Sequence, residues 1–223
     1  MTTRPTGLRE RKKQATRIAL REAALRLALE QGPDNVRVEE IAEAAGVSPR
    51  TYNNYFSSRE QAIVAAITAD REARVAAMVA ARAPEARLAD AIIEAVLAQY
   101  TDPGEHRRDA LSLITTRPAL RAAFLNATDT ITPPLADAIA GHLRDTHGLT
   151  ARVLAAGVAA AVRVALEQWL QPTTGVLATS GFVVTSGSLP DLLRAALAPL
   201  EPALDAAEQR HMETVEAERL PRE

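Results

Sequence analysis

The chain has 223 residues, of which 47 % are hydrophobic and only 3 % aromatic, and its formal net charge is −2. This length supports one large domain or two smaller ones, and a core rich in alanine and leucine favours helix. The sequence has no cysteine, which excludes disulfides and zinc–thiolate sites. The charged first 30 residues do not resemble a secretory signal. The most apolar run, 153–162, is followed by Arg163 and is too short to span a membrane, so we expect a cytoplasmic protein.

The charge is distributed unevenly along the chain. Residues 1–26 contain eight Lys and Arg side chains and two Glu side chains, a net of +6, so the rest of the chain carries −8. A basic end on an acidic chain favours contact between that end and a polyanion. The alternative is a solvated basic tail. We expect a disordered basic arm at 1–10 and place Lys12 and Lys13 among the candidate contacts to nucleic acid.

The first helix is predicted over 11–31. Leu20, Ala24, Leu27 and Ala28 follow the spacing of one helical face. Gly32-Pro-Asp-Asn then predicts a turn.

A second helix is predicted from Val38, because Val38, Ile41, Ala42 and Ala45 form an apolar stripe. Gly46 ends this helix, since glycine tolerates the left-handed backbone that turns the chain.

A third helix is predicted to start at Ser48 and Pro49, which are typical of a helix N-terminus. Tyr52 and Phe56 share its inner side. The opposite side carries Arg50, Asn53 and Asn54. Helix, glycine turn and a second helix with an exposed Arg/Asn face make a helix-turn-helix that reads DNA. The predicted core of the three-helix bundle is Leu20, Leu27, Ile41, Val47 and Phe56.

The rest of the chain is predicted to be helical almost throughout. The predicted helices cover 58–81, 85–100, 105–116, 118–131, 132–145, 150–170 and 189–207. Ser58 with Gln61, and Ser188 with Asp191, have the spacing of capping boxes. Residues 172–188 predict a loop or a brief extended pairing, and 208–223 a charged, frayed tail. The expected fold is all-α, with a helix-turn-helix domain at 11–67 joined by the long helix to a larger helical domain at 68–207.

Two stretches resemble known families. Val38-Glu-Glu-Ile-Ala-Glu-Ala-Ala-Gly-Val-Ser-Pro-Arg-Thr, followed by Asn-Tyr-Phe and Arg-Glu, resembles the N-terminal domain of the TetR family of bacterial transcriptional regulators. Leu113-Ile-Thr-Thr-Arg-Pro-Ala-Leu-Arg, 155–169 and Leu189-Pro-Asp-Leu-Leu resemble the acyl-CoA-responsive, mycofactocin-system subgroup. The resemblance implies a homodimer, formed by a four-helix bundle of 150–170 and 189–207, that binds a double-stranded DNA operator and a small-molecule effector.

In DNA recognition, base edges give sequence information and phosphates give placement. Arg50 can bond bidentately to guanine, and Asn53 or Asn54 to adenine. The resemblance assigns contacts with phosphate or sugar to Thr51, Tyr55 and Arg59. The further candidates are Arg37, Ser48, Pro49, Lys12 and Lys13. The competing interpretation is that these polar residues are merely solvated.

Candidate ligand-binding residues lie in the second domain. Arg163 has two interpretations: an ion pair with Glu167 one helical turn away, or a partner for an anionic ligand or for the other protomer. The candidate pocket walls, each of which also fits plain core, are Met78, Tyr100, Leu113, Ile114, Phe124, Leu125, Ile131 and Trp169. The four histidines lack metal-ligand spacing and no catalytic motif is present, so we expect no enzyme, metal or cofactor.

These patterns predict a DNA-binding transcriptional regulator, a repressor released from its operator by a small apolar ligand such as an acyl-CoA. The first alternative is a DNA-binding adaptor whose helical domain binds protein. The second is an enzyme that uses the helical domain.

Overall fold

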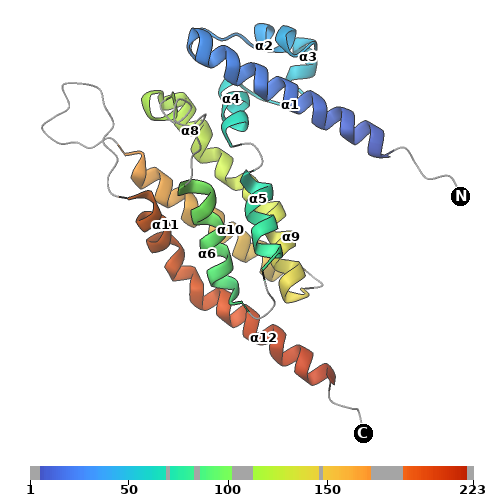
Figure 1. Cartoon of the computed structure of the whole chain (residues 1–223), viewed down its shortest axis with the longest axis vertical. Helices are drawn as coiled ribbons and strands as arrows, with labels where there is room; N and C mark the ends of the chain where they lie inside the picture. Colours follow the sequence, from blue (N-terminus) through green and yellow to red (C-terminus); the bar gives the residue numbers. More distant parts are fainter. Residues whose placement is uncertain are drawn as a thin grey trace, which may run out of the picture. The chain divides into compact units, whose positions relative to one another are not determined.

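The computed structural model describes residues 6–68, 71–82, 86–101, 113–145, 148–171 and 188–219. All regular secondary structure in these ranges is helical (Figure 1), which confirms the predicted all-α fold. The chain forms two compact units. Unit 1 comprises Met1–Ala69 and Glu105–Ala127, and unit 2 comprises Asp70–Gly104 and Thr128–Glu223.

The first helix, α1, spans Thr6–Gln31. It begins at Thr6 and not at the expected residue 11, because Leu8, Arg9 and Glu10 in the intervening stretch are good helix formers. The part of the predicted disordered arm that is described is therefore helical. Leu20, Ala24 and Ala28 are buried, and Leu27 is half-buried. Gly32 ends the helix with φ +83°.

Three further helices complete unit 1 around α1. They are α2 (Val38–Ala44), α3 (Pro49–Tyr52) and α4 (Arg59–Ile67). The helix α8 (Pro118–Asn126) also belongs to this unit, and it packs against α4. Ile41 and Phe56 are buried as predicted, whereas Val47 is half-buried.

The long helix predicted over 58–81 is wrong, because the structure divides it into α4 and α5 (Arg71–Ala80). The division falls at Thr68, which has φ −92° and ψ 4°. The backbone N–H and the hydroxyl of Thr68 both donate to Val64 O, at 2.9 and 3.0 Å. Such a bond from a threonine hydroxyl competes with continuation of the helix.

Unit 2 contains α5 and a set of helices around α10. They are α6 (Leu88–Thr101), α9 (Thr132–Leu143), α10 (Leu149–Trp169), α11 (Leu189–Leu197) and α12 (Glu201–Arg219). Two 3-10 turns, Ala127–Ile131 and Ala198–Leu200, precede α9 and α12. α10 packs against α9 and α11. Gly157 of α10 faces Leu200, whose Cδ2 would lie 3.4 Å from a Cβ at this position.

The length and composition of α10 would also fit a membrane span, and in the described part of the chain this is true of that helix alone. The most apolar part of α10 is 44 % buried, however, and a core helix of a soluble protein can have the same length and composition.

Several predicted helix ends in the C-terminal half are wrong. The helix expected over 118–131 ends at Asn126 and continues as a 3-10 turn. Ser188 does not cap with its side chain, and Asp191 N donates instead to Ser188 O. α12 runs to Arg219 instead of fraying from residue 208. The side chain of Glu208 explains this extension in part, since it accepts from Leu88 N at 3.2 Å and bonds His142 Nε2 at 3.1 Å.

Two predictions fall on residues outside the described ranges. They are the loop or extended pairing over 172–188, except Ser188, and the first part of the helix predicted over 105–116. Residues 113–116 are helical.

Candidate nucleic-acid interface

The glycine turn between α2 and α3 has the predicted geometry. Gly46 has φ +68°, in the left-handed region. Its N–H donates to Glu43 O and that of Val47 donates to Ala42 O, both at 2.9 Å. These bonds satisfy carbonyl groups that the end of α2 would otherwise leave without partners.

The start of α3 is fixed by Ser48. Its hydroxyl oxygen accepts from Thr51 N at 3.1 Å and lies 2.9 Å from Thr51 Oγ1. Pro49 occupies the first helical position, where its fixed φ suits the helix and its missing N–H costs nothing.

The inner side of α3 is held by two aromatic residues. Tyr52 and Phe56 are buried, and their ring centroids lie 5.8 Å apart. The Tyr52 hydroxyl donates to Ser58 O at 2.8 Å. Burial raises the pKa of Tyr52 to about 12, and the negative charge of Glu60 acts in the same direction. Packing and a hydrogen bond therefore both orient this short element.

The outer side carries the three predicted base readers. Arg50, Asn53 and Asn54 are exposed. α3 itself is one turn long, so Asn53 is its C-cap and Asn54 follows it. The N–H groups of these two asparagines donate to Pro49 O and Thr51 O, both at 3.1 Å. Both asparagine side chains are exposed, so they can reach an external partner.

The predicted flanking contacts differ in exposure. Ser48, Pro49 and Arg37 are exposed, whereas Thr51 and Tyr55 are half-buried. Arg37 precedes α2, and its backbone N–H donates to Glu40 Oε2 at 3.0 Å. An arginine side chain has no acceptor and cannot cap a helix N-terminus. The exposed guanidinium of Arg37 therefore does not cap α2, and it remains a candidate contact to DNA.

Arg59 has partners that the resemblance did not imply. Its Nη1 donates to Asp34 O and Val36 O, both at 2.9 Å, and its Nε donates to Glu60 Oε1 at 2.8 Å. Arg59 thus braces the start of α4 against the turn between α1 and α2, and the phosphate contact that the resemblance implies stays a prediction. Partial burial favours the neutral form of Glu60, but hydrogen bonds from Arg59, from the backbone and from Ser58 outweigh it and lower the pKa of this carboxyl.

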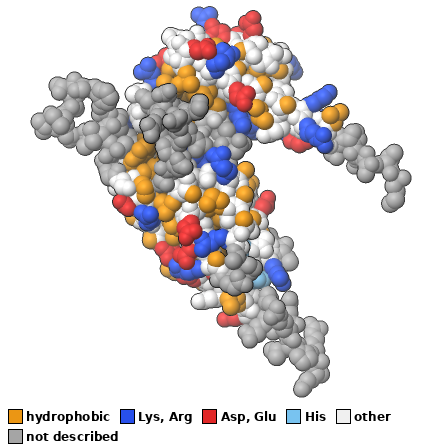
Figure 2. All heavy atoms as spheres, in the orientation of Figure 1, with side chains coloured by type: hydrophobic (Ala, Val, Ile, Leu, Met, Phe, Trp, Pro, Cys, Tyr) orange, Lys and Arg blue, Asp and Glu red, His pale blue; other side chains and the backbone are white. Residues whose placement is uncertain are grey.

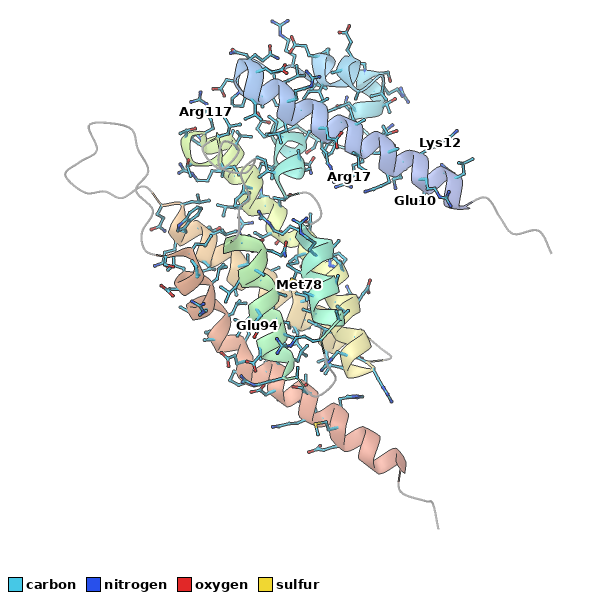
Figure 3. The ribbon with its side chains drawn as sticks, in the orientation of Figure 1. Glu10, Lys12, Arg17, Met78, Glu94 and Arg117 are labelled. Carbon is cyan, nitrogen blue, oxygen red and sulfur yellow. The ribbon has the colours of Figure 1, made fainter. Side chains whose placement is uncertain are left out.

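The N-terminal half of α1 is strongly basic. Lys12 and Lys13 are exposed, and blue side chains stand along this part of the helix in Figure 2. Arg17, labelled with Lys12 in Figure 3, lies 5.7 Å from the ring centroid of Phe56. The sequence interpretation missed Arg17. Its signal was its place in the basic run of residues 1–26, and its side chain is exposed.

Comparison with known protein families shows to which family this chain belongs. Residues 20–66 match the model of bacterial regulatory proteins of the tetR family. Residues 82–205, more than half of the chain, match the model of the MftR C-terminal domain. This chain belongs to the TetR family. The resemblance to this family found in the sequence is thereby confirmed.

Curated relatives of this TetR family regulator are themselves described as regulators. The chain is 35 % identical over 142 residues to the HTH-type transcriptional regulator TcmR of Streptomyces glaucescens, covering 60 % of this chain and 63 % of TcmR. It is 45 % identical over 76 residues to the HTH-type transcriptional regulator BetI of Rhizobium meliloti (strain 1021), covering 32 % of this chain and 37 % of BetI. The chain thus spans less than two thirds of the length of either relative.

Solved structures are similar at lower identity. FadR of Thermus thermophilus, a TetR family repressor in complex with lauroyl-CoA, is 23 % identical, with a TM-score of 0.46 and coverage of 83 % of this chain and 93 % of that one. NalD of Pseudomonas aeruginosa is 20 % identical, with a TM-score of 0.39 and coverage of 86 % and 97 %.

The predicted ligand-binding residues of this regulator are divided between the units. Leu113, Ile114, Phe124 and Leu125 belong to unit 1. Met78, Tyr100, Ile131, Arg163 and Trp169 belong to unit 2. Ile114, Phe124 and Ile131 are buried, and the other apolar members are half-buried or exposed.

Arg163 makes the ion pair given by the simpler of its two interpretations, with Nε 2.9 Å from Glu167 Oε1. An open pocket of about 1100 Å³ lies elsewhere in unit 2, among α5, α9 and α12, and none of the nine candidates lines it.

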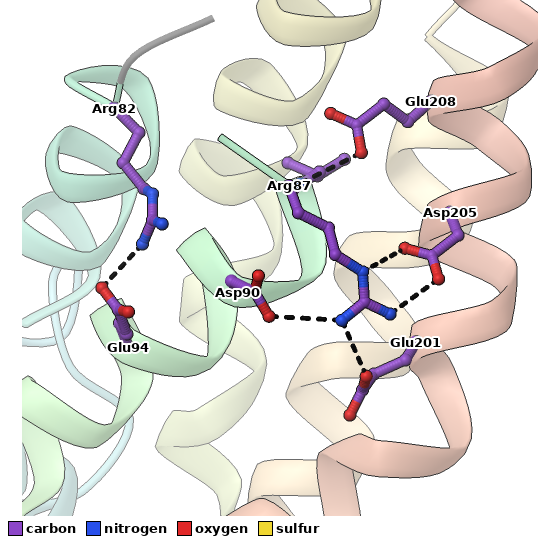
Figure 4. A network of polar contacts seen from close by, with 8 residues as sticks. Arg82, Arg87, Asp90, Glu94, Glu201, Asp205 and Glu208 are labelled. Carbon is purple, nitrogen blue, oxygen red and sulfur yellow. Dashed lines mark hydrogen bonds and ion pairs between the residues drawn. The ribbon is translucent and has the colours of Figure 1, made fainter. Parts of the chain in front are cut away.

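The wall of this pocket includes part of a polar network that ties α6 to α12 (Figure 4). Arg87 bonds both oxygens of Asp205, at 2.8 and 2.7 Å, and lies 3.1 Å from Glu201. The hydrogen bond from Arg87 lowers the pKa of Asp205. Within the described ranges, no group of three His, Asp or Glu residues has the arrangement of a metal site.

Proposed function

We propose that this TetR family regulator is a homodimeric repressor that binds a near-palindromic operator and leaves it when an acyl-CoA binds. The observation that carries the DNA-binding part is the outer side of α3. Three side chains that can bond bases are exposed: Arg50 of α3, and Asn53 and Asn54 directly after it. The buried rings of Tyr52 and Phe56 anchor the same stretch of chain on its inner side.

The proposal gives each DNA-binding residue a role. Arg50, Asn53 and Asn54 read base edges. Phosphate or sugar contacts fall to the exposed or half-exposed side chains and helix starts around them, which are Arg37, Ser48, Pro49, Thr51, Tyr55, Lys12 and Lys13. Arg59 acts indirectly, by bracing the turn before α2.

The exposed side of α10 supports the homodimer. Leu149, Val153 and Val164 are 67 %, 63 % and 57 % exposed. Ala156 and Ala160, also exposed, lie between them at helical spacing. An apolar stripe of this kind favours burial against another protein surface. In a twofold dimer the stripe of one protomer packs against the same stripe of its partner. The two helix-turn-helix elements of such a dimer would bind half-sites about one DNA turn apart.

The effector part of the proposal rests on the C-terminal half. Residues 82–205 match the MftR C-terminal model, the subgroup that the sequence also resembles. Candidate contacts in unit 2 are Met78, Tyr100, Ile131, Arg163 and Trp169. An acyl-CoA can release DNA only if it binds the non-reading state of the dimer more tightly than the reading state.

Titration of the full chain into labelled DNA from upstream of its own gene tests the proposal, with a saturated acyl-CoA series added to the complex. We expect binding that weakens steeply with salt, because phosphate contacts release counterions, and dissociation with some chain lengths. Binding that ignores every acyl-CoA would favour the adaptor whose helical domain binds protein. Binding that is insensitive to salt would reject the phosphate contacts.

A further inference from the structure

Two arginines from different helices meet at Asp34, in the turn between α1 and α2. Arg59, at the start of α4, donates to the backbone oxygen of Asp34 at 2.9 Å. Arg117, immediately before α8, places Nε 2.9 Å from the carboxylate oxygen Oδ2 of the same residue. Asp34 and Arg117 lie 83 positions apart in the sequence, so this ion pair joins the α1–α2 turn to a remote part of the chain.

The turn that carries Asp34 is braced from within. Asn35 N donates to Gly32 O at 3.1 Å, and Asn35 Nδ2 donates to Gln31 O at 2.7 Å. Val36 is fully buried, and its carbonyl accepts from Arg59. Arg37 and α2 follow directly. These bonds and the burial of Val36 connect the turn that carries Asp34 to the start of α2.

Arg117 is equally well fixed on its own side. Leu120 and Phe124 of α8 are buried, and α8 packs against α4. Arg121, one turn into α8, donates from Nη2 to Thr115 O at 2.7 Å. From Asn126 the chain continues without interruption through the 3-10 turn into α9. Arg117 is labelled in Figure 3.

We propose that Arg117 is a positioning residue for DNA reading: through Asp34 it holds the α1–α2 turn, and with it α2 and α3, in the orientation that binds the operator. This inference rests on the proposed DNA-binding function and adds α8 to the parts of the protein that set operator affinity. It also gives α8 a second connection to the helix-turn-helix, separate from its packing on α4.

The exposure of the pair limits the size of the effect. The side chains of Arg117 and Asp34 are 47 % and 66 % exposed, and pairs of this kind contribute a factor of about two to five each. Two protomers on one operator use the pair twice, so we expect loss of the pair to weaken operator binding by about four- to 25-fold.

A double-mutant cycle on the full chain tests the proposal, with Asp34→Asn, Arg117→Gln and the double variant. Operator affinity is measured by fluorescence anisotropy, and thermal stability is measured beside it. We expect each single variant to weaken operator binding about four- to 25-fold, and the double variant to be no weaker than the singles. Hydrogen exchange at the amides of Ile41 and Ala45, which bond across α2, should accelerate in both single variants.

The pair Arg26–Glu30 supplies a matched control. Its side chains are 53 % and 56 % exposed, and it lies within α1 alone, so it joins no two elements. Glu30→Gln and Arg26→Gln make the same charge changes as Asp34→Asn and Arg117→Gln, but should leave exchange in α2 unchanged and show no coupling in operator affinity.

Additive losses at Asp34 and Arg117, or losses equal to those of the control pair, would overturn the proposal. A wild-type chain that binds no upstream DNA would instead reject the proposed function. If a neutral variant fails to fold, Asp34→Glu and Arg117→Lys keep both charges, and each must retain operator affinity closer to wild type than to the ion-pair loss expected above.

Discussion

α3 in unit 1 and α10 in unit 2 are held in place by opposite means. α3 has four residues, and its position depends on a serine cap, two buried aromatic rings and a hydroxyl bond to Ser58 O. α10 has 21 residues and depends on many small and branched apolar side chains spread along its length. The outer side of α3 is polar, whereas the outer side of α10 is apolar.

The polar outer side of α3 and the apolar outer side of α10 suit different kinds of partner. Exposed guanidinium and amide groups on a fixed backbone suit base edges and phosphates. An exposed apolar stripe suits another protein surface. The two helices also differ in how their stabilising contacts are distributed. The short α3 depends on one or two residues, whereas the long α10 depends on many.

Tyr52→Ala should give the largest effect. Removing a buried aromatic side chain costs about 3–5 kcal/mol, and here it also removes the bond to Ser58 O. Chemical denaturation followed by circular dichroism measures the loss. Val158→Ala in the buried side of α10 is the comparison and should cost about 1.6 kcal/mol plus a cavity contribution. An equal cost at the two sites would contradict concentrated anchoring in α3.

Val153→Glu should disrupt the proposed dimer. It places a charge in the middle of the apolar stripe of α10, twice in a symmetric interface. We expect the dimer dissociation constant to rise about 100-fold, equivalent to about 2.7 kcal/mol. Sedimentation velocity across a concentration series measures it. Arg152→Glu, at the exposed neighbouring position, is the control, and a dimer unaffected by Val153→Glu would place the interface elsewhere.

Alkaline conditions should destabilise unit 1 through Tyr52. The pKa of this hydroxyl rises from 10.0 to about 12 in the folded protein, so the folded state keeps a proton that the unfolded chain loses. The stabilisation of the folded state by the neutral Tyr52 hydroxyl is complete below pH 10. It is lost as the pH rises toward 12, and the free energy of unfolding then falls by a total of about 2.7 kcal/mol. Denaturation at several pH values measures the loss, and Tyr52→Phe should remove it. Parallel curves for the two proteins would reject this origin.

Arg59→Ala should lower the stability of unit 1. The substitution removes charged hydrogen bonds to two backbone carbonyls. Because the Arg59 side chain is 33 % exposed, we expect their loss to cost about 1.5–3 kcal/mol in total. Operator binding should weaken through this loss of stability with an unchanged salt slope. A slope reduced by about one would instead show that Arg59 contacts phosphate.

Arg50→Ala should have the smallest energetic effect and the most specific one. We expect preference at one base pair to relax by about 1–3 kcal/mol, with the stability of the protein unchanged. Binding to a library of single-base operator variants measures it. Lys12→Ala should weaken all sequences alike. An unchanged base preference in Arg50→Ala would move base reading to another residue.

Local patterns predicted unit 1 well. Gly46, Ser48 and Pro49 each act within a few residues, and the spacing of Tyr52 and Phe56 was enough to place the inner and outer sides of α3. Arg59 shows the limit, because its partners Asp34 and Val36 lie more than twenty residues away. The Asp34–Arg117 pair depends on how α8 packs, which no periodicity reveals.

Unit 2 was predicted less well because its helices are rich in alanine. Alanine and leucine favour helix without marking where one ends, so the extension of α12 depended on a particular side-chain bond. The end of α4 at Thr68, in unit 1, was missed for the same reason. The candidate ligand residues were chosen as large apolar side chains. This criterion does not distinguish core from pocket, and the structure divides these residues between two units.

Trp169, at the end of α10, is the single tryptophan of the chain. Two of the three tyrosines, Tyr52 and Tyr55, lie in unit 1. Selective excitation of tryptophan therefore reports on unit 2 without any label. An effector that changes this emission while the operator remains bound would separate ligand capture from DNA release in time, within one unmodified protein.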